Sequence, residues 1–499
     1  MEQPDPVAPS PPERSACLLG IGLLAVAALT RVWYALTKSL VLDEFHSTYH
    51  AFNGAGAEFF TQLARDNHPP LSFLLIGTAS EALGRSELAV RTPALVLGLV
   101  EIALVARLAA QLGASRGRAL LAAALLATSA MHFDYGTQAR MYVPYSLMIT
   151  SCLSAIVTLL REDGKGRRGA ALCLAIGAAA ALHTHYYAVQ YIFALALAGA
   201  IAVGLAPGRV ARLAVPLIAA LVAFLPWGLT GFKTQLGHGL PPGLSRLGPD
   251  ALAETYIHLF THNVSFAGSP AKWIFVAGAG LALLLAARGA WLLLADRERR
   301  SRGIAVSAVA FGVPAAAWLL ANISPRAGFT WHYCMPSAAA AAVLAGLGAR
   351  GGVAIAAASA QVALGTVLLG LHLSHPATED FRGAVRHALA RHAAAETAGL
   401  TAELVAVEWQ PTLFPQGRPY DHYAPRLMEA GAPPRAPIVE GGFQVKDMAP
   451  LLAADRVILV TRSLPSSQPL RARLREAFPA RTEANFGYGV DVIEYARRP

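Results

Sequence analysis

The chain has 499 residues, of which 55% are hydrophobic and only 14% charged, and its mean hydropathy is +0.45. These values exclude a soluble domain of this length and indicate a polytopic membrane protein. The 41 basic and 31 acidic residues give a net charge of +10. Because Lys and Arg form short clusters between apolar runs, they indicate membrane topology, and we expect no nucleic-acid partner.

The N-terminal part contains a tail and a first span. Residues 1–15 are Pro-rich and without a periodic pattern, so we expect a disordered cytoplasmic tail. The apolar run from Ala16 to Leu36 is long enough to cross a bilayer and has no evident cleavage site after it, which favours an uncleaved signal anchor. The four cysteines all lie in apolar runs, so the sequence predicts neither a disulfide framework nor a thiolate metal site.

Apolar runs of about 20 residues predict about eleven transmembrane helices. They cover residues 16–37, 87–112, 119–134, 141–160, 169–186, 188–206, 213–231, 271–294, 303–321, 334–349 and 352–373. With the N-terminus in the cytoplasm, every basic cluster between the spans falls on the cytoplasmic side, as the positive-inside rule requires. The predicted transmembrane domain is 16–373, and the C-terminus lies outside.

Two external loops interrupt this domain, at 38–86 and 232–270. In the first, the run Pro69–Leu83 is too short for a span and is predicted to be interfacial or re-entrant. Phe45, Thr48, Tyr49 and Phe52 recur at helical spacing, which predicts a helix on the membrane surface with Asp43 at its start. The second loop contains a similar candidate helix near residues 250–260.

The last part of the chain, 374–499, has the charge density of a soluble domain. Its patterns predict a small extracytoplasmic α/β domain. We expect helices near 380–399 and 468–478 and strands at Ala402–Glu408, Arg456–Thr461 and Val490–Tyr495. The chain has no Walker loop, Rossmann fingerprint or solenoid period.

Ionisable residues at membrane depth are costly and therefore mark candidate sites. Under the predicted topology most of them gather at the outward ends of the spans: Asp43, Glu44, His46, His50, Asp66, His68, Asp134, Arg140, His183, His185, Arg326 and His332. This convergence predicts an active site on the outer side of the membrane.

Several of these residues have alternative interpretations. Asp43 and Glu44 suit a helix cap or a catalytic base beside a positioning or cation-binding group; adjacent carboxylates diverge and do not form a dyad. His68 precedes Pro69 and suits a rigid turn or a site. Arg140 suits a snorkelling side chain or a phosphate ligand, because its planar guanidinium matches phosphate oxygens.

The segment His183-Thr-His185-Tyr-Tyr187 contains two histidines two residues apart. On a helix such side chains point away from each other, so hydrogen-bonding roles are favoured over a metal clip. We therefore predict no metal site from the sequence, although a divalent cation stays open.

Five segments in this order resemble the family 39 glycosyltransferases, which include the protein O-mannosyltransferases, and the architecture resembles the lipid A aminoarabinose transferases. They are the acidic pair after the first span, His-Pro-Pro-Leu (68–71), Arg-Thr-Pro-Ala-Leu (91–95), Ala-Arg-Met-Tyr (139–142) and His-Thr-His-Tyr-Tyr (183–187). Glu379-Asp-Phe-Arg-Gly383 also resembles the start of the soluble domain in bacterial members. The resemblance implies a GT-C fold and a bacterial inner-membrane enzyme with a periplasmic C-terminal domain.

The resemblance also implies roles for particular residues. Asp43 would be the catalytic base, Arg140 would contact the phosphate of a polyprenyl-phosphate sugar donor, and His68 and Tyr142 would line the site. The chain departs from its relatives at Trp331-His332-Tyr333, where they often carry Arg-Tyr. The second phosphate contact would then come from Arg326 or His332.

The expected reaction is transfer of a hexosyl or pentosyl group with inversion, since a lipid phosphate leaves readily and one base suffices. The acceptor would be an unidentified hydroxyl outside the cytoplasm. A transporter or flippase for a lipid-linked sugar and a polysaccharide polymerase or ligase are the alternatives, followed by a non-catalytic receptor. The sequence contains no repeated halves, which disfavours a transporter.

Overall fold

A computed structural model describes residues 11–52, 54–161, 164–204, 206–237, 248–261, 270–324, 328–374, 379–407, 419–428, 439–440, 444–445, 448–462, 468–487 and 489–497. The chain divides into two compact units. The helical unit comprises 1–34, 55–75 and 91–374, and the α/β unit comprises 35–54, 76–90 and 375–499. The predicted division into 1–15, 16–373 and 374–499 stays a prediction.

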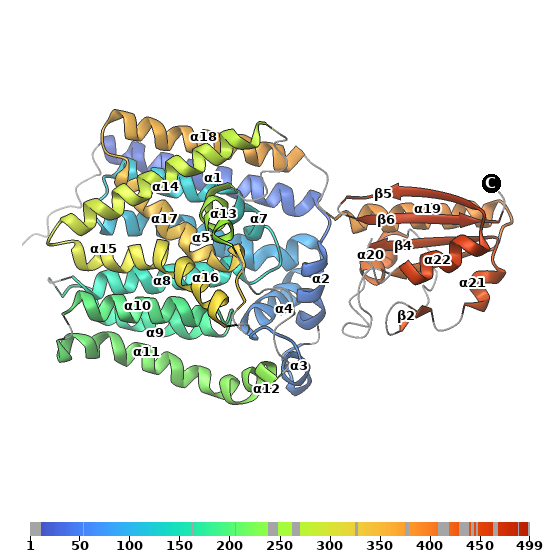
Figure 1. Cartoon of the computed structure of the whole chain (residues 1–499), viewed down its shortest axis with the longest axis horizontal. Helices are drawn as coiled ribbons and strands as arrows, with labels where there is room; N and C mark the ends of the chain where they lie inside the picture. The colour runs from blue at the N-terminus through green and yellow to red at the C-terminus, as the bar shows by residue number, and fades with distance from the viewer. Residues whose placement is uncertain are drawn as a thin grey trace, which may run out of the picture. The chain divides into compact units, whose positions relative to one another are not determined.

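The helical unit is a bundle of long apolar helices with shorter ones at their ends (Figure 1). Its helices are α1 (Pro11–Thr37), α3 (Ala57–Leu63), α4 (Leu71–Leu83), α5 (Glu87–Gln111), α6 (Arg116–Ala127), α7 (Ala130–Gly136), α8 (Tyr142–Leu159), α9 (Arg167–Leu182), α10 (Ala188–Ala202), α11 (Pro207–Trp227), η1 (Gly228–Phe232), α12 (Lys233–Gly237), α13 (Pro249–Thr261), α14 (Lys272–Ala295), α15 (Arg300–Ser307), η3 (Ala308–Gly312), α16 (Val313–Ile323), η4 (Trp331–Cys334), α17 (Met335–Gly348) and α18 (Gly352–Ser374). Of these, α1, α4 and α5 continue into the α/β unit.

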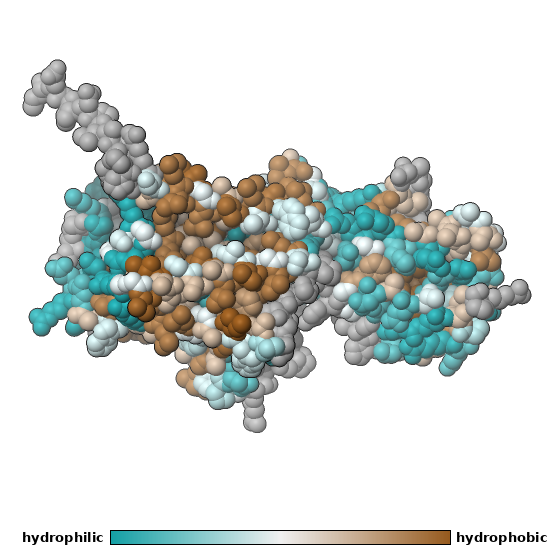
Figure 2. Space-filling view, turned by 90° about the horizontal axis from the view of Figure 1, so that it is seen from above, coloured by the Kyte–Doolittle hydropathy of each residue, from teal (hydrophilic) through white to brown (hydrophobic). Residues whose placement is uncertain are grey.

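Seven helical segments of the described chain are long and apolar enough to span a membrane. They are Ser15–Thr37, Glu87–Gln111, Tyr142–Leu159, Pro207–Gly237, Lys272–Ala295, Arg300–Ile323 and Gly352–Ser374. Many of their large apolar side chains are exposed, and Figure 2 shows a hydrophobic surface over the helical unit and mostly hydrophilic residues over the α/β unit. The chain is therefore a multi-pass membrane protein, while the number of eleven spans stays a prediction.

One sequence prediction at the start of the bundle needs correction. The run 119–134 is not one helix, because α6 ends at Ala127 and α7 begins at Ala130. Between them the hydroxyl of Thr128 donates to Ala124 O, and Ser129 Oγ accepts from His132 N and caps α7.

Helix α17 lies at the centre of the bundle, and all of its residues are buried. Its contact with α14 depends on glycine, because a Cβ at Gly289 would lie 1.9 Å from Leu344 O. In the same way, a Cβ at Gly348 would lie 2.0 Å from Leu285 O. Small residues at such crossings let two backbones approach closely, which is a main source of helix association in membranes.

The α/β unit contains a four-stranded sheet in the order β1-β4-β6-β5. Its strands are β1 (Ala402–Val407), β4 (Arg456–Arg462), β5 (Ala480–Asn485) and β6 (Val490–Ala496). Strand β1 pairs in parallel with β4, with Ala402 opposite Arg456, whereas β6 pairs antiparallel with both β4 and β5. Two short strands, β2 (Val439–Glu440) and β3 (Gln444–Val445), form a separate antiparallel pair.

Helices α19 (Phe381–Thr397), α20 (Pro419–Leu427), α21 (Ala449–Ala453) and α22 (Gln468–Ala477) complete the soluble part of this unit. Leu470 and Leu474 of α22 pack with Val457, Leu459 and Ile493 of the sheet, while α19 packs against β1, β4 and β6. The predicted helices and the three predicted strands are confirmed. Strand β5 escaped prediction because its sequence, Ala-Arg-Thr-Glu-Ala-Asn, is polar and mostly exposed at the sheet edge.

Helix α2 (Leu42–Ala51) belongs to the α/β unit. Its apolar face is buried by protein: the Phe45 ring is 2% exposed and makes edge contacts with Phe381 and Tyr423. The prediction of a helix here is confirmed. Its placement on a membrane surface stays a prediction.

Candidate functional site

Arg140 and Tyr142 stand at the turn between α7 and α8 in the helical unit. Both are nearly buried, at 6% and 4% exposure. Arg140 Nη2 lies 3.5 Å from the Tyr142 hydroxyl, and its guanidinium carbon is 5.6 Å from the centre of the Tyr142 ring. The cation is thus held beside an aromatic face instead of reaching outward as a snorkelling side chain does.

His332 and Tyr333 come from η4, the single turn that leads into the buried α17. The His332 ring centroid is 4.9 Å from that of Tyr142, and the Tyr333 ring is 6.3 Å from it. His332 Nε2 lies 3.0 Å from the Thr330 hydroxyl. A segment nearly 190 positions later in the sequence therefore brings two polar rings to the α7–α8 turn.

His185 joins the same cluster from the turn between α9 and α10. Its ring lies 5.9 Å from Tyr142 and 4.8 Å from Tyr333, and it stacks on Tyr145 at 5.1 Å. The backbone N–H of Tyr187 donates to His185 Nδ1 at 3.1 Å. A neutral His185 therefore carries its proton on Nε2, which can donate a hydrogen bond.

His68 lies at the edge of this cluster, with its ring 6.5 Å from His185. Its Nδ1 is 3.6 Å from a carboxylate oxygen of Asp66, so the two residues form a pair on the segment between α3 and α4. Gln235 Nε2 donates to His68 O and helps to fix this turn. We call Arg140, Tyr142, His185, His332, Tyr333 and His68 the Arg140 group.

His183 does not belong to the Arg140 group. Its Nδ1 lies 2.9 Å from Ala179 O, its ring meets Phe224 at 5.2 Å, and it lines a mainly apolar cavity of about 790 Å³ beside α3 and α11. His183 and His185 thus face different surroundings. Arg326 lies outside the described residues.

Sequence reasoning missed three aromatic residues beside the Arg140 group: Tyr135, Tyr145 and Trp331. The Tyr135 ring lies 4.7, 5.9 and 5.7 Å from the rings of Tyr142, Trp331 and His332, and Tyr145 stacks on His185. Tyr142 and Tyr145 are three residues apart on α8, so helical spacing of the tyrosines was a usable signal.

The acidic pair stands in the first turn of α2, in the α/β unit. Asp43 is exposed, whereas Glu44 is fully buried and its Oε2 accepts from Val41 N at 2.9 Å. The two carboxylates diverge as predicted. Glu44 therefore caps its own helix, which leaves Asp43 as the carboxylate presented on the surface of this helix.

Glu379 fixes the start of α2. Its Oε2 accepts from Leu42 N at 2.6 Å, and its Oε1 pairs with Arg462 at the end of β4, also at 2.6 Å. Burial raises the pKa of this carboxyl; the Leu42 N–H and Arg462 oppose the shift, and the carboxylates of Asp43 and Glu44 add to it. The segment Glu379-Asp-Phe-Arg-Gly thus positions α2, and Asp380 also caps α19 through Gly383 N.

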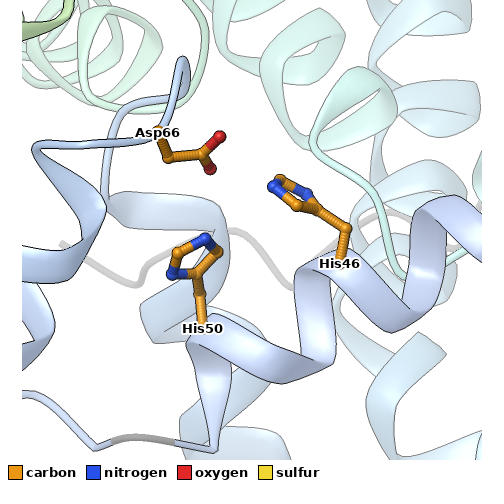
Figure 3. Close-up of side chains that lie close together, drawn as sticks. All are labelled: His46, His50 and Asp66. Carbon is orange, nitrogen blue, oxygen red and sulfur yellow. The ribbon is translucent and has the colours of Figure 1, made fainter. Parts of the chain in front are cut away.

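His46 and His50 lie one turn apart on α2, and their rings extend from the same side of the helix, 5.2 Å apart (Figure 3). Two imidazoles at this spacing offer nitrogen ligands for a divalent cation. The third labelled residue, Asp66, belongs to the helical unit and pairs with His68 as described above.

The Arg140 group combines a buried cation with hydroxyl groups and imidazoles that are buried or half-buried. A buried guanidinium can bind phosphate oxygens through charge-assisted hydrogen bonds, which are stronger than in water. The aromatic faces around it suit an apolar or sugar-bearing ligand.

The fold has a known counterpart. The structure of ArnT from Cupriavidus metallidurans bound to undecaprenyl phosphate is similar over 95% of this chain and 97% of that chain, with a TM-score of 0.56 and 13% sequence identity. The chain thus has an ArnT-like fold. The predicted fold class is confirmed.

Part of the sequence also matches a known family model. Residues 67–228 match the family model for dolichyl-phosphate-mannose-protein mannosyltransferase, and the predicted resemblance to the family 39 glycosyltransferases is confirmed. This match includes His68, Arg140, Tyr142, His183 and His185. No curated protein sequence matches the chain significantly.

Two further structures give weaker similarities. Apo ArnT from Cupriavidus metallidurans aligns over 96% of this chain and 98% of that chain, with a TM-score of 0.44 and 15% identity. The S. cerevisiae Pmt1-Pmt2 protein O-mannosyltransferase complex bound to the sugar donor aligns over 48% of this chain and 35% of that chain, with a TM-score of 0.35 and 17% identity. At these scores neither similarity establishes a shared fold.

Proposed function

We propose that the protein is an inverting glycosyltransferase that moves a sugar from a polyprenyl-phosphate carrier to an acceptor hydroxyl outside the cytoplasm. The observation that carries this proposal is the Arg140 group, in which segments from four parts of the helical unit meet around one buried cation. The match to a dolichyl-phosphate-mannose mannosyltransferase family and the fold of an undecaprenyl-phosphate-binding protein support the donor class.

In the proposed reaction the acceptor oxygen attacks the anomeric carbon of the sugar. A new C–O bond forms as the bond from that carbon to the phosphate oxygen breaks, and the electron pair leaves with the lipid phosphate. The acceptor proton passes to Asp43. A single displacement of this kind inverts the anomeric configuration.

Arg140 would stabilise the departing phosphate. Charge grows on this group as the bond breaks, and a cation held in advance lowers the barrier without reorganisation. The Nε2–H of His185 and the Tyr142 hydroxyl would complete the hydrogen bonds, with His332 as the second phosphate contact. The proposal requires that Asp43, on α2, contacts the acceptor while the Arg140 group contacts the donor.

The test is transfer by the purified full-length chain. A labelled sugar on a polyprenyl monophosphate is offered with envelope lipid, glycan and protein acceptors, and the product is analysed for anomeric configuration. We expect transfer with inversion by the wild type and none by Asp43→Asn, which preserves shape but cannot accept the proton. Donor binding by the variant, measured separately, stays intact.

A matched control is Asp250→Asn, which changes an acid on the separate helix α13. This variant should keep full activity. Turnover by Asp43→Asn would refute the assignment of the base. Movement of labelled lipid across vesicles without transfer to any acceptor would instead support the flippase alternative.

A further inference from the structure

A second polar cavity lies at the other end of α8 from Arg140. It has a volume of about 680 Å³, and the ends of α8 and α10 and the turn after α14 border it together with the starts of α9, α11 and α15. Helix α8 is 18 residues long, so about 27 Å separates this cavity from the Arg140 group. It is therefore a separate site.

Six arginines line this cavity, and they come from three separate turns of the chain: Arg161, Arg167, Arg209, Arg212, Arg297 and Arg300. No acidic residue is among the described lining residues. Asp296 and Glu298 stand nearby in the sequence, as do Glu162 and Asp163, which lie outside the described residues. Even if all four acids faced the cavity, the six guanidinium groups would leave it positively charged.

Half of these arginines have no partner within the described part of the chain. The side chains of Arg209, Arg212 and Arg297 are exposed and make no hydrogen bond or ion pair there. Two others bind helix ends: Arg167 Nη2 donates to Arg161 O at 2.7 Å, and Arg300 Nε donates to Leu294 O at 2.8 Å. The cavity thus presents guanidinium groups with unused donors.

The backbone adds to this positive field. Helices α9, α11 and α15 begin at the cavity, and none of the three has a side-chain cap among the described residues. Their first N–H groups carry the positive ends of the helix dipoles. The carbonyl ends of α8 and α14 also lie here, and the two arginine hydrogen bonds described above satisfy part of them.

The cavity also has an apolar edge. Ile201, at the end of α10, lines it while remaining 55% exposed, and Leu159, Leu160, Leu213 and Ile304 complete that edge. Since α11 and the segment α15–α16 are candidate membrane spans, this rim lies where their bilayer-facing surfaces end. A cavity with a cationic interior and an apolar rim fits an amphiphile better than a free ion.

We propose that this cavity binds the headgroup of an anionic phospholipid that carries two phosphate groups. Each phosphate would be held by two or three guanidinium groups in bidentate contacts, while the acyl chains lie along α10 and α11. The positive-inside rule explains basic residues in such loops, but it does not require three loops to converge on one cavity. Basic pockets between membrane helices are suited to such headgroups.

The test measures lipid binding to the purified full-length protein in detergent. Diphosphatidylglycerol, phosphatidylglycerol and phosphatidylcholine are added in mixed micelles, and bound lipid is counted by native mass spectrometry. Thermal unfolding is recorded in parallel. Inorganic pyrophosphate serves as a soluble probe of the same phosphate chemistry. The key variant is Arg209→Gln with Arg212→Gln, and the matched control is Arg168→Gln, the neighbour of Arg167 that does not line the cavity.

We expect the wild type and Arg168→Gln to retain diphosphatidylglycerol and to gain thermal stability from it. The double variant should bind it at least about a hundredfold more weakly, because it loses two charge-assisted contacts and each of them is worth about tenfold or more in affinity. Its melting temperature in phosphatidylcholine should equal that of the wild type, which shows correct folding.

Two results would overturn the proposal. One is equal retention of diphosphatidylglycerol by the wild type and the double variant. The other is stabilisation by pyrophosphate that matches the lipid and also depends on Arg209 and Arg212, which would assign the cavity to a soluble polyanion. Stronger binding of the lipid at low salt than at high salt would support the proposed electrostatic contact.

Discussion

Two polar clusters of the helical unit differ in the contacts that hold them together. The first is a triad of Arg31, His132 and Glu101, at most 1% exposed. Arg31 Nη2 lies 3.2 Å from His132 Nδ1, and His132 Nε2 lies 3.3 Å from Glu101 Oε2. The second is the Arg140 group, whose members are linked mainly by ring contacts.

Groups of the protein hold the triad in place. Glu101 Oε1 accepts from Ser146 and Thr150 at 2.6 and 2.9 Å, and Arg31 donates to the carbonyl oxygens of Ala27 and Ala127. Because an arginine donates to His132 Nδ1, the neutral ring holds its proton on Nε2, the atom that faces Glu101. The triad therefore links α1, α5, α7 and α8.

The Arg140 group is built differently. Arg140 lies against the Tyr142 ring and hydroxyl, and the His332 ring lies 4.9 Å from that of Tyr142. The comparison teaches that close polar contacts hold the triad together, whereas packed rings surround the Arg140 guanidinium.

The largest expected effect is on the triad. Replacing Glu101 by Leu leaves Arg31 and His132 buried without their acid, so we expect a loss of about 3–5 kcal/mol in the free energy of unfolding. Denaturant unfolding of the purified protein in detergent measures it. Activity per folded molecule should hardly change. A variant that stays stable but loses turnover would place the triad in the chemistry instead.

The next effect is on the Arg140 group. Arg140→Gln should lower transfer about 100- to 1000-fold, because the proposed contact with the departing phosphate is lost. Arg140→Lys should recover only part of the rate, since an ammonium cannot form bidentate contacts with phosphate. Steady-state kinetics measures both variants. Thermal unfolding should be nearly unchanged, in contrast to Glu101→Leu; a collapse of stability would show that Arg140 is structural.

A smaller effect is expected at His185. Replacement by Phe keeps the ring that stacks on Tyr145 but removes the Nε2–H donor. One neutral hydrogen bond is worth about 1 kcal/mol, so the Michaelis constant for the donor should rise roughly fivefold. The same replacement at His183, outside the group, is the control and should leave this constant unaffected. Equal changes in both variants would remove the distinction between the two histidines.

The smallest effect concerns His422, a histidine of the α/β unit. Burial, with Arg426 and Arg85 nearby, lowers the pKa of His422 to about 3, whereas an unfolded histidine titrates near 6.5. As the pH falls, the unfolded state therefore binds a proton at His422 before the folded state does. The stability that the folded state has above pH 6.5 is lost progressively as the pH falls towards 3. Melting temperatures between pH 7.5 and 5 should fall less steeply in His422→Gln than in the wild type. Parallel curves would contradict this shift.

Much of the fold followed from the sequence because hydrophobic runs and amphipathic periods are local signals. The helices at α2, α13 and α19 and the strands β1, β4 and β6 occur where their patterns predicted them. The predicted topology also placed Arg140, His185 and His332 at the same end of their spans, and the family resemblance added Tyr142.

What the sequence did not predict depends on contacts between distant segments. The triad was overlooked, although Arg31 and Glu101 are charged residues inside apolar runs and could have signalled it. The separation of His183 from His185 depends on Phe224 and α11, which are distant in the chain. Likewise, only the folded α/β unit reveals that Glu379 holds the first peptide of α2.

The Glu379 bridge has a consequence for how this molecule must work. The Glu379 carboxylate accepts a hydrogen bond from the backbone N–H of Leu42, the first residue of α2, and forms an ion pair with Arg462 at the end of β4. Any tilt of the sheet therefore moves α2 and the Asp43 carboxylate with it. Truncating the chain before residue 379 would remove both contacts that fix the start of α2.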